Sequence, residues 1–344
     1  MLVGVVRDRR FLDHKTGLGH PEQPARLAEI YRALDWDFPT QFQEFTPRSA
    51  TLEELERVHT PAYTAAILAS AHRRFTILAP DTHASAASCL AAWLSAGACL
   101  TGLEALLAGQ VQACFALVRP PGHHALPDRG EGFCLFNNLA ITARHAQVHF
   151  GLKRILIVDW DVHHGNGIQE VFYQDPGVFY LSTHDLHAFP WSGNWDETGH
   201  GPGRGYTVNV PIVRHLADDD LVGLYADLLP AVIKAYRPQL ILGAAGFDAH
   251  HRDPLGCTKI TSEGHHGVAN LLASLGPVER GIPLLLSLEG GYDPRALTKS
   301  VVRVLEALLE PRPYTTQGRH PSELAAELAR RARKSHAAYK VWTG

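Results

Sequence analysis

The chain has 344 residues, of which 45% are hydrophobic and 19% charged, and its formal net charge is −3. These values describe an ordinary globular protein that can bury a rigid interior site, and they provide no extended basic field for direct binding to nucleic acid. The first residues lack the apolar core of a signal peptide, and no apolar run of about 18 residues predicts a membrane span.

The cysteines and histidines narrow the possible kinds of protein further. The cysteines are odd in number, widely spaced and without a CxxC pair, which predicts a reduced, intracellular and specifically cytoplasmic protein. They are Cys89, Cys99, Cys114, Cys134 and Cys257. Histidine occurs 21 times, and because imidazole ligates metals and titrates near neutrality, this enrichment favours a metal site, although most copies are expected on the surface or in the core.

Short continuous apolar runs predict buried strands, and the stretches between them predict helices. The predicted strands are 3–6, 114–118, 155–158, 178–181, 240–243 and 284–288. The predicted helices are 23–34, 84–108, 137–150, 218–236, 262–275 and 294–309. Because the strands are continuous rather than alternating and are separated by helices, we expect a three-layer α/β fold around a mainly parallel sheet.

The domain organisation follows from the absence of repeats and linker-like segments in the sequence. We expect a single domain over residues 1–344, with a core that ends at about residue 310 and a helical extension over 311–344. The extension carries a basic run, which we interpret as a solvated helix face, with contact to a partner chain as the alternative. The basic residues are Arg330, Arg331, Arg333 and Lys334. The oligomeric state stays open, with a homo-oligomer as one option.

The carboxyl ends of parallel strands are where open α/β sheets bind ligands, and the first such end follows residues 114–118. There, two prolines and a glycine precede the adjacent pair His123 and His124. A histidine pair presented in this way suits general acid–base catalysis. Each imidazole needs an acceptor that orients it, and the carboxylate of Asp159 and the amide of Asn166 are the two candidates.

The next strand end, after 155–158, begins a group of metal-ligand side chains. Asp159, Asp161 and His163 alternate, so they point to one side while the chain stays extended. Two carboxylates and an imidazole are costly to bury unpaired, and a divalent cation relieves that cost. Asp248 follows the strand at 240–243, and Asp161, His163 and Asp248 together leave a fourth position open, as catalytic zinc requires.

Three residues near Asp248 have the same ligand chemistry. His250, His251 and Asp253 follow it closely in the sequence. We interpret the two histidines as rim residues and give none of the three a place on the metal.

Two further strand ends carry oxygen donors. After 284–288 the sequence EGGYD lets the chain turn at two glycines and could aim the Tyr292 hydroxyl inward as an oxyanion donor, whereas a buried structural tyrosine is the alternative. After 178–181, Ser182 and nearby carbonyl groups could bind a hard cation. The chain lacks GxSxG and HExxH, which excludes serine hydrolases of that type and the zincin metalloproteases.

These segments resemble the zinc-dependent histone deacetylase superfamily, most closely its class II branch and the bacterial histone deacetylase-like proteins and acetylpolyamine amidohydrolases. The motifs are RPPGHHA, GFCLFNN, DWDVHHGNG, GFDAHHRDPLG and EGGYD. The resemblance extends from about residue 19 to about residue 309. It implies the arginase–deacetylase fold, with one central eight-stranded parallel sheet between layers of helices.

The resemblance also implies roles for individual residues. It implies one zinc ion per chain, with Asp161, His163 and Asp248 as its ligands. The remaining catalytic positions are the tandem histidines His123 and His124, the carboxylate Asp159 behind the first, the amide Asn166 beside the second, and the catalytic tyrosine Tyr292. Asn166 stands where class I enzymes have aspartate.

Potassium and the substrate channel come from the same resemblance. One potassium ion would be bound by the side chains of Asp159 and Ser182 and by main-chain oxygens of Asp161, His163 and Thr183. A second ion would use main-chain oxygens near Phe172, Asp175, Val178 and Tyr206. The channel would be lined by Gly132, Phe133, an aromatic residue from Phe189 or Trp191, and Leu255 at the rim.

The expected function is zinc-dependent hydrolysis of an acetyl or other short acyl group from the side-chain amine of lysine in a protein or peptide. Three alternatives stay open. Acetylpolyamine hydrolysis is disfavoured by Leu255, which stands where a glutamate marks one polyamine-specific branch. An arginase-like hydrolase with two manganese ions needs more carboxylates than the segment at 159–164 provides. A non-enzymatic acyl-lysine binder would not need the intact catalytic set.

Overall fold

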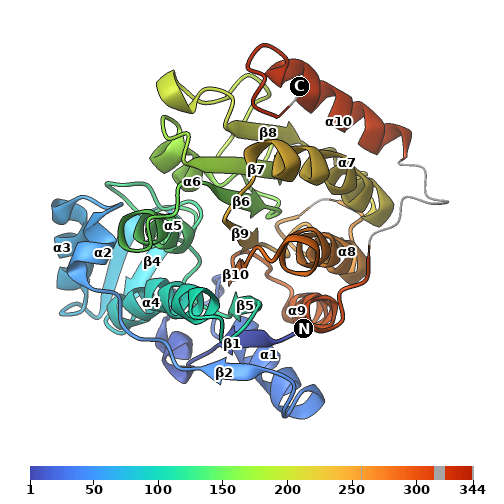
Figure 1. Cartoon of the computed structure of the whole chain (residues 1–344). Helices are drawn as coiled ribbons and strands as arrows, with labels where there is room; N and C mark the ends of the chain where they lie inside the picture. Colours follow the sequence, from blue (N-terminus) through green and yellow to red (C-terminus); the bar gives the residue numbers. More distant parts are fainter. Residues whose placement is uncertain (257, 314–321, 343–344) are drawn as a thin grey trace.

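The computed structural model describes residues 1–256, 258–313 and 322–342. Its centre is an eight-stranded sheet in the order β2-β1-β5-β10-β9-β6-β7-β8, and every neighbouring pair is parallel (Figure 1). The strands are β1 (Val3–Val6), β2 (Gln43–Phe45), β5 (Ala113–Ala116), β6 (Ile155–Asp159), β7 (Val178–His184), β8 (Thr207–Pro211), β9 (Leu240–Ala245) and β10 (Leu284–Leu288). The predicted fold class is confirmed.

The two edge strands were missing from the sequence prediction for a physical reason. β2 has three residues, none of them buried, and therefore shows no apolar run. β8 is buried but reads TVNVP, with Asn209 in its middle and a proline at its end, which interrupts the continuous apolar pattern of a parallel strand. The six predicted strands all lie inside the sheet.

Helices cover both faces of the sheet. Figure 1 shows α4 and α5 on one face and α1, α9, α8 and α7 on the other. The long helices are α1 (Ala25–Asp37), α4 (Ser88–Leu107), α5 (Asn138–His149), α7 (Asp218–Tyr236), α8 (Ser262–Ala273) and α9 (Pro294–Leu309). Shorter elements are α2 (Leu52–Glu56), α3 (Pro61–Ser70), α6 (Asn166–Phe172) and the hairpin β3 (Phe75–Ala79) with β4 (Thr82–Ser85). The hairpin lies at the side of the molecule that carries α2 and α3.

Helix α4 is apolar along its whole length. By length and composition it could cross a membrane, but 72% of its apolar window is buried inside the protein. Its glycines permit this close packing, because a Cβ on Gly97 would come 1.8 Å from the carbonyl oxygen of Arg48 and one on Gly102 would come 2.7 Å from Leu285. The helix therefore has the burial of a core helix.

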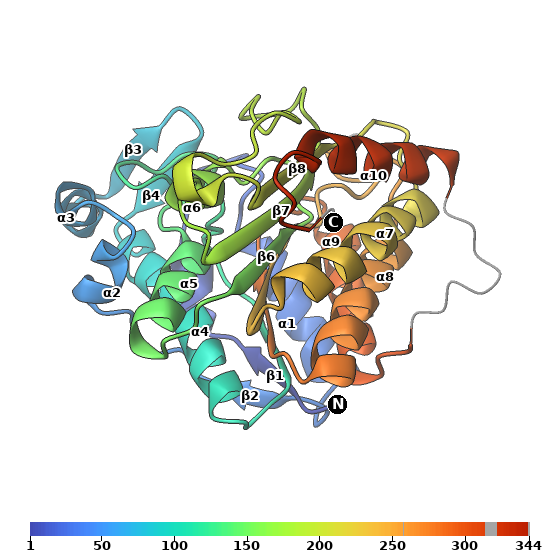
Figure 2. The ribbon, with the colours of Figure 1, turned by 45° about the horizontal axis from the view of Figure 1, so that its top comes forward.

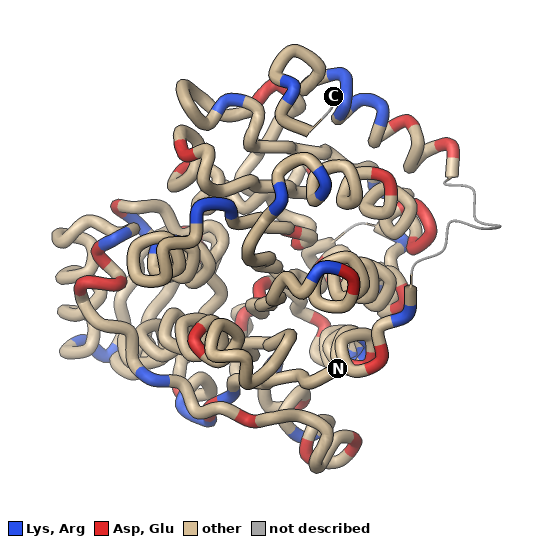
Figure 3. Tube along the Cα trace, in the orientation of Figure 1, with Lys and Arg blue, Asp and Glu red and all other residues tan. Residues whose placement is uncertain are grey.

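The C-terminal part of the chain packs on the far edge of the sheet. Helix α10 (Glu323–His336) lies across α7 and β8 (Figure 2), and the Nε2 of His336 donates to the carbonyl of Thr207 at 2.7 Å. The basic run predicted for the C-terminal extension lies on this helix. Figure 3 shows several basic residues along it, whereas acidic and basic residues are mixed over most of the chain. Arg330 is solvated and paired with Glu327, whereas Arg331 stacks on Trp195 and Arg333 binds Asp227. The prediction of a solvated face therefore holds for only part of the run.

The cysteines that the structure describes are unpaired. Cys89, Cys99, Cys114 and Cys134 are free and buried, and Cys257 lies outside the described residues. The stretches 314–321 and 343–344 of the predicted extension lie outside them too.

Candidate active site

Three metal-ligand side chains meet beyond the carboxyl ends of β6 and β9. One ligand atom from each of Asp161, His163 and Asp248 lies within 4.8 Å of the other two. The adjacent strands pair in parallel register, with Asp159 beside Ala244, so the segments that follow them run side by side. The Nδ1 of His163 is 3.0 Å from Asp161 Oδ1 and 3.0 Å from Asp248 Oδ2. The structure thus brings together two segments almost ninety residues apart in the sequence.

Main-chain groups hold the other oxygen of each carboxylate. Gly290 N donates to Asp161 Oδ2 at 2.8 Å, and Val162 N donates to Asp248 Oδ1 at 2.9 Å. Glycine is required at 290 because a Cβ there would come 2.0 Å from Asp248 Oδ2. The remaining oxygens, Asp161 Oδ1 and Asp248 Oδ2, face the His163 ring, and Asp161 Oδ1 also accepts from His163 N at 2.9 Å. Outer contacts of this kind orient metal ligands.

The electrostatics of this cluster fit a bound cation. Burial, together with the neighbouring charge of Asp161, raises the pKa of Asp248. Burial alone would lower the pKa of His163, but Asp248 and Asp161 outweigh it and raise that pKa well above its usual value. Two buried carboxylates this close repel each other, and a divalent cation removes the repulsion. Two oxygen donors and one imidazole nitrogen are the donor types of catalytic zinc, which keeps a further position open.

The tandem histidines lie beside this cluster, each against a different partner. His123 Nδ1 donates to Asp159 Oδ2 at 3.1 Å, and His124 Nδ1 lies 2.8 Å from Asn166 Oδ1. The Nδ2 of Asn166 donates to Glu131 at 2.7 Å, which orients the amide so that its oxygen accepts from His124. The Nδ1 of a neutral His124 is therefore protonated, and its Nε2 keeps a free lone pair.

The two imidazoles differ in basicity. Burial alone would lower the pKa of His123, but the carboxylates of Asp161 and Asp159 outweigh it and raise that pKa to about 10. Burial lowers the pKa of His124 well below its usual value, and the neighbouring His123 and His163 lower it further. The pair is thus divided into a charged imidazolium and a neutral imidazole, which suits the second for work as a base.

Glu289, which directly follows β10, supports the histidine pair. Its Oε2 accepts from the main-chain N–H of Gly122 at 2.7 Å and of His123 at 3.1 Å. The side chain is fully buried, and burial raises its pKa to about 7. Sequence reasoning assigned it no role, although a glutamate directly after a buried apolar strand was a usable signal.

Tyr292 is placed by the turn that follows β10. Gly291 has a φ of 118°, a left-handed conformation that favours glycine. Tyr292 N donates to Asp253 Oδ2 at 2.5 Å, and the guanidinium of Arg26 lies 4.8 Å from the centre of the Tyr292 ring. Burial raises the pKa of Tyr292 well above its usual value, so the phenol stays protonated and can donate a hydrogen bond.

Two residues in the segment after Asp248 have other roles than the sequence predicted. Asp253 is not a bystander, because its carboxylate holds the main chain of Tyr292. His250 is buried at 4% exposure, so its interpretation as a rim residue is wrong, whereas His251 is exposed. The carboxylate of Asp253 reaches Tyr292 across 39 positions of sequence, a contact that no local pattern encodes.

Two phenyl rings stand beside these groups. The Phe189 ring is 5.0 Å from that of His124, and the Phe133 ring is 5.5 Å from that of Tyr292. A Cβ on Gly132 would come 2.3 Å from His124 and 2.9 Å from Phe189, so the absence of a side chain there leaves the space between them open. Of the two aromatic candidates after β7, Phe189 contacts the histidine, whereas Trp191 is 71% exposed. Leu255 is 39% exposed, near the turn held by Asp253.

The residues predicted to hold potassium lie together at the ends of β6 and β7. Asp159 and Ser182 are direct neighbours in the sheet register. Ser182 Oγ is 2.8 Å from His184 Nδ1, and Thr183 Oγ1 is 2.8 Å from the hydroxyl of Tyr225, which also donates to the Asp159 carbonyl. In the second predicted set, Asp175 N donates to the carbonyl of Phe172 and Val178 N to that of Asp175. Potassium itself stays a prediction.

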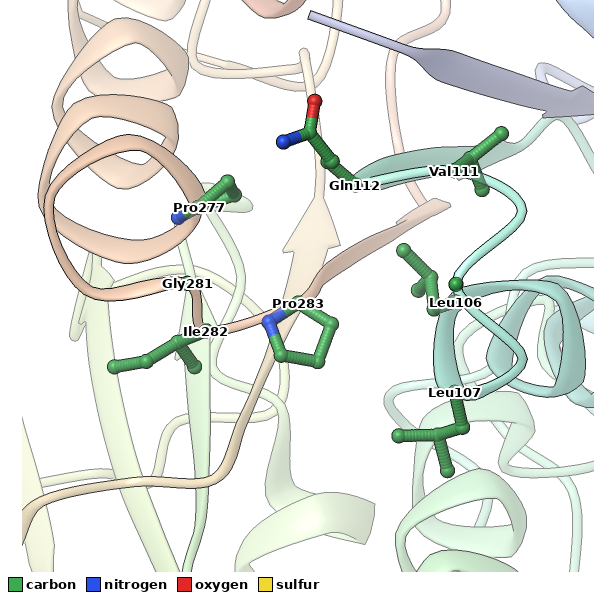
Figure 4. Close-up of a pocket in the computed structure, with 9 residues that line it drawn as sticks. Leu106, Leu107, Val111, Gln112, Pro277, Gly281, Ile282 and Pro283 are labelled. Atoms are coloured by element: carbon green, nitrogen blue, oxygen red, sulfur yellow. The ribbon is translucent and has the colours of Figure 1, made fainter.

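A separate cavity lies at the opposite end of the sheet. It has a volume of about 320 Å³ and is lined by the end of α4 and the residues that lead into β5 and β10 (Figure 4). Its walls include Leu106, Val111, Ile282 and Pro283. No titratable side chain lines this cavity, in contrast to the cluster at the carboxyl end of the strands.

Comparison with known proteins gives matches along almost the whole chain. A model of the histone deacetylase domain matches residues 20–308. The chain is 39% identical to histone deacetylase 15 of Arabidopsis thaliana over 86% of its own length and 53% of that protein. It is 38% identical to a probable deacetylase of Methanothermobacter thermautotrophicus over 91% of the chain and 93% of that protein.

A third relative is named for a different substrate. The chain is 36% identical to the polyamine deacetylase HDAC10 of Homo sapiens over 92% of the chain and 49% of that protein. Among solved structures, that of the HDA15 HD domain superposes with a TM-score of 0.91 at 35% identity, covering 99% of this chain and 95% of the other. The chain thus spans about half the length of two of these relatives and nearly all of the archaeal one.

Proposed function

The chain belongs to the histone deacetylase family and is a deacetylase, and we propose that it is a zinc-dependent amidohydrolase acting on acetylated or other short-chain acylated lysine side chains of proteins or peptides. The observation that carries the proposal is the convergence of Asp161, His163 and Asp248 within 4.8 Å of one another. The His124 ring centre lies 5.9 Å from that of His163, and Tyr292 lies in the turn after β10, the strand paired with β9.

The chain's own residues divide the work of hydrolysis. When zinc is bound by the three ligands, it supplies a Lewis acid for the acyl carbonyl and makes water more acidic. His124 accepts the proton of the attacking water on its free Nε2 and then donates it to the leaving amine. The protonated Tyr292 hydroxyl donates to the oxyanion. His123, which donates to the Asp159 carboxylate, stabilises negative charge without transferring a proton.

A turnover panel with the zinc-loaded protein tests the proposal. The substrates are acetyl-lysine and longer acyl-lysine peptides together with acetylated spermidine, and metal content is measured on the same sample. We expect one zinc per chain and turnover of acetyl-lysine. Absence of turnover with every substrate, at one zinc per chain, would refute the enzymatic proposal and favour a non-enzymatic binder.

Hydrolysis of acetylated polyamines is the second candidate. It is supported by 36% identity to a relative named as a polyamine deacetylase. It is opposed by the apolar Leu255 at the rim, since a polycationic substrate is favoured by a carboxylate there. The ratio of kcat/KM for acetylspermidine to that for an acetyl-lysine peptide separates the two.

An arginase-like centre with two manganese ions is disfavoured because the described residues supply a single three-donor cluster, and two zinc or manganese equivalents per chain would revive it.

Potassium is proposed beside Asp159 and Ser182. Its test is the dependence of thermal stability on potassium at constant ionic strength, with sodium as the control.

A further inference from the structure

A row of aromatic rings leads from Tyr292 to the surface of the β3–β4 hairpin. Successive ring centres are 5.5 Å apart from Tyr292 to Phe133, 4.7 Å from Phe133 to His20, 5.5 Å from His20 to His83, and 5.3 Å from His83 to Phe75. These are ordinary separations for packed rings. The row therefore links the buried Tyr292 through packed rings to the exposed Phe75.

Main-chain hydrogen bonds hold this row in place. His20 Nδ1 accepts from Glu22 N at 3.1 Å while its Nε2 donates to the carbonyl of Asp81 at 3.1 Å. Phe133 N donates to Thr82 Oγ1 at 3.0 Å. The turn of the hairpin is thus attached both to the loop before α1 and to the channel wall, so its position relative to Tyr292 is set before any ligand arrives.

The outer end of the row is apolar and exposed. Ile77 is the cross-strand partner of His83, which puts both on the same face of the hairpin as Phe75. Phe75 is 45% exposed, Ile77 69%, and Leu18 107%. Leu18 is next to Gly17, where a Cβ would come 3.8 Å from the Phe75 ring. Phe75 and Ile77 are thus exposed on one face of the hairpin, and Leu18 is exposed on the loop that lies beside Phe75. Exposed apolar side chains that gather in this way mark an interaction surface.

A second exposed ring is linked to the active site through Phe189. Trp191 is 71% exposed, and its ring lies 5.6 Å from that of Phe189, which in turn contacts His124. Exposed apolar residues are therefore linked through packed rings to Tyr292 by way of Phe133 and to His124 by way of Phe189. A free polyamine has no apolar side chains with which to occupy either side.

Resting on the proposed deacylase function, we propose that Leu18, Phe75 and Ile77 form a docking surface for the polypeptide that carries the acyl-lysine, and that this surface selects aromatic or aliphatic residues next to that lysine. The occupant is an extended peptide segment that crosses the mouth while the acylated side chain descends between Phe133 and Phe189. Its neighbouring side chains lie on the hairpin face on one side and on Trp191 on the other.

The primary test compares matched peptides with the zinc-loaded full chain. One acetyl-lysine peptide carries Trp and Leu at the flanking positions, a second carries Ser and Gly, and acetylspermidine is the third substrate. We expect kcat/KM to be about tenfold higher for the first peptide than for the second, since burial of one or two apolar side chains suffices for that factor. The gain should appear in KM, because contacts remote from the amide stabilise substrate and transition state alike.

Variants assign the preference to the hairpin. Phe75→Ser combined with Ile77→Ser should reduce the tenfold preference to about twofold or less. Val148→Ser is the matched control, because Val148 is 64% exposed on α5, and it should leave the preference intact. If the double variant does not fold, Leu18→Ser replaces it, since a fully exposed residue contributes little to folding, and it should lower the preference about threefold.

The outcomes separate this inference from the proposed function. Equal kcat/KM for the two peptides, or a preference that survives the hairpin substitutions, overturns the docking surface while the deacylase function stands. A higher kcat/KM for acetylspermidine than for either peptide also overturns it. If no substrate is turned over, the proposed function fails, and calorimetric titration of the two peptides still decides whether the surface discriminates between them.

Discussion

The two ends of the central sheet differ in chemistry although the same strands form both. At the carboxyl end, Asp161, His163 and Asp248 converge within 4.8 Å, and backbone N–H groups hold both carboxylates. At the amino end, a cavity of about 320 Å³ is lined by leucine, isoleucine, valine and proline, with Gln112 as the polar side chain. The apolar cavity therefore does not mark the active site of this protein, whereas the convergence of polar side chains does.

The largest effect should come from removing a metal ligand at the carboxyl end. Asp248→Ala deletes one of three donors, and we expect zinc content to fall well below one per chain and kcat to fall by more than about a thousandfold, since a Lewis acid contributes several kcal/mol. Metal analysis and turnover of an acetyl-lysine peptide measure both. Full zinc content with near-normal turnover would contradict the assignment of this cluster.

The next largest loss of activity should come from removing the groups proposed to transfer protons and to donate to the oxyanion. His124→Ala and Tyr292→Phe should each lower kcat at least about a hundredfold. Because neither residue is a metal ligand, zinc content should stay at one per chain, which distinguishes these variants from Asp248→Ala. Near-wild-type turnover in either variant counts against the mechanism.

A smaller effect should follow from changing the partner of His124. Asn166→Asp puts a carboxylate where an amide oxygen lies 2.8 Å from His124 Nδ1, and an adjacent carboxylate raises the pKa of an imidazole. The base must be neutral to act, so activity is lost as pH falls through that pKa. We expect the acidic limb of the kcat/KM profile to move to higher pH by about one unit.

The control for this pH shift is Asn166→Ala, which removes the acceptor without adding charge. It should lower the rate but should not move the acidic limb upward. An unchanged limb in Asn166→Asp would mean that His124 is not the group whose ionisation limits activity.

The smallest effect on catalysis should come from the amino end. Leu106→Ala enlarges the apolar cavity, and we expect the free energy of unfolding to fall by about 2–4 kcal/mol while kcat, KM and zinc content stay at wild-type values. Denaturant titration and the same kinetic assay measure the two quantities. A change in kcat at constant zinc content would show that the two ends of the sheet are coupled.

Much of this contrast was predictable from the chain. Six apolar runs identified the inner strands, because a strand buried on both faces needs continuous hydrophobic residues. The rule that ligands bind beyond the carboxyl ends of such strands then pointed to Asp161, His163 and Asp248. The two edge strands were not predicted, because β2 is not buried and β8 contains Asn209.

Several parts of the site were outside the reach of sequence patterns. Glu289 and Asp253 act on main-chain N–H groups of distant segments. The position of Glu289 after a buried strand was a usable signal, but no local pattern identifies the segment that either carboxylate reaches. The sequence offered Phe189 and Trp191 as equivalent aromatic residues, whereas the structure puts one against His124 and leaves the other exposed. The ring row from Tyr292 to Phe75 joins four separate segments.

The sequence by itself determined the fold class and the kinds of ligand at each strand end, since hydrophobic periodicity and residue type are local properties of the chain. The tertiary structure alone decided which main-chain groups hold the ligand carboxylates, which segments Glu289 and Asp253 reach, and which of the two aromatic residues after β7 lies against His124. Those outcomes depend on strand order and loop packing, which bring together atoms that the chain itself holds far apart.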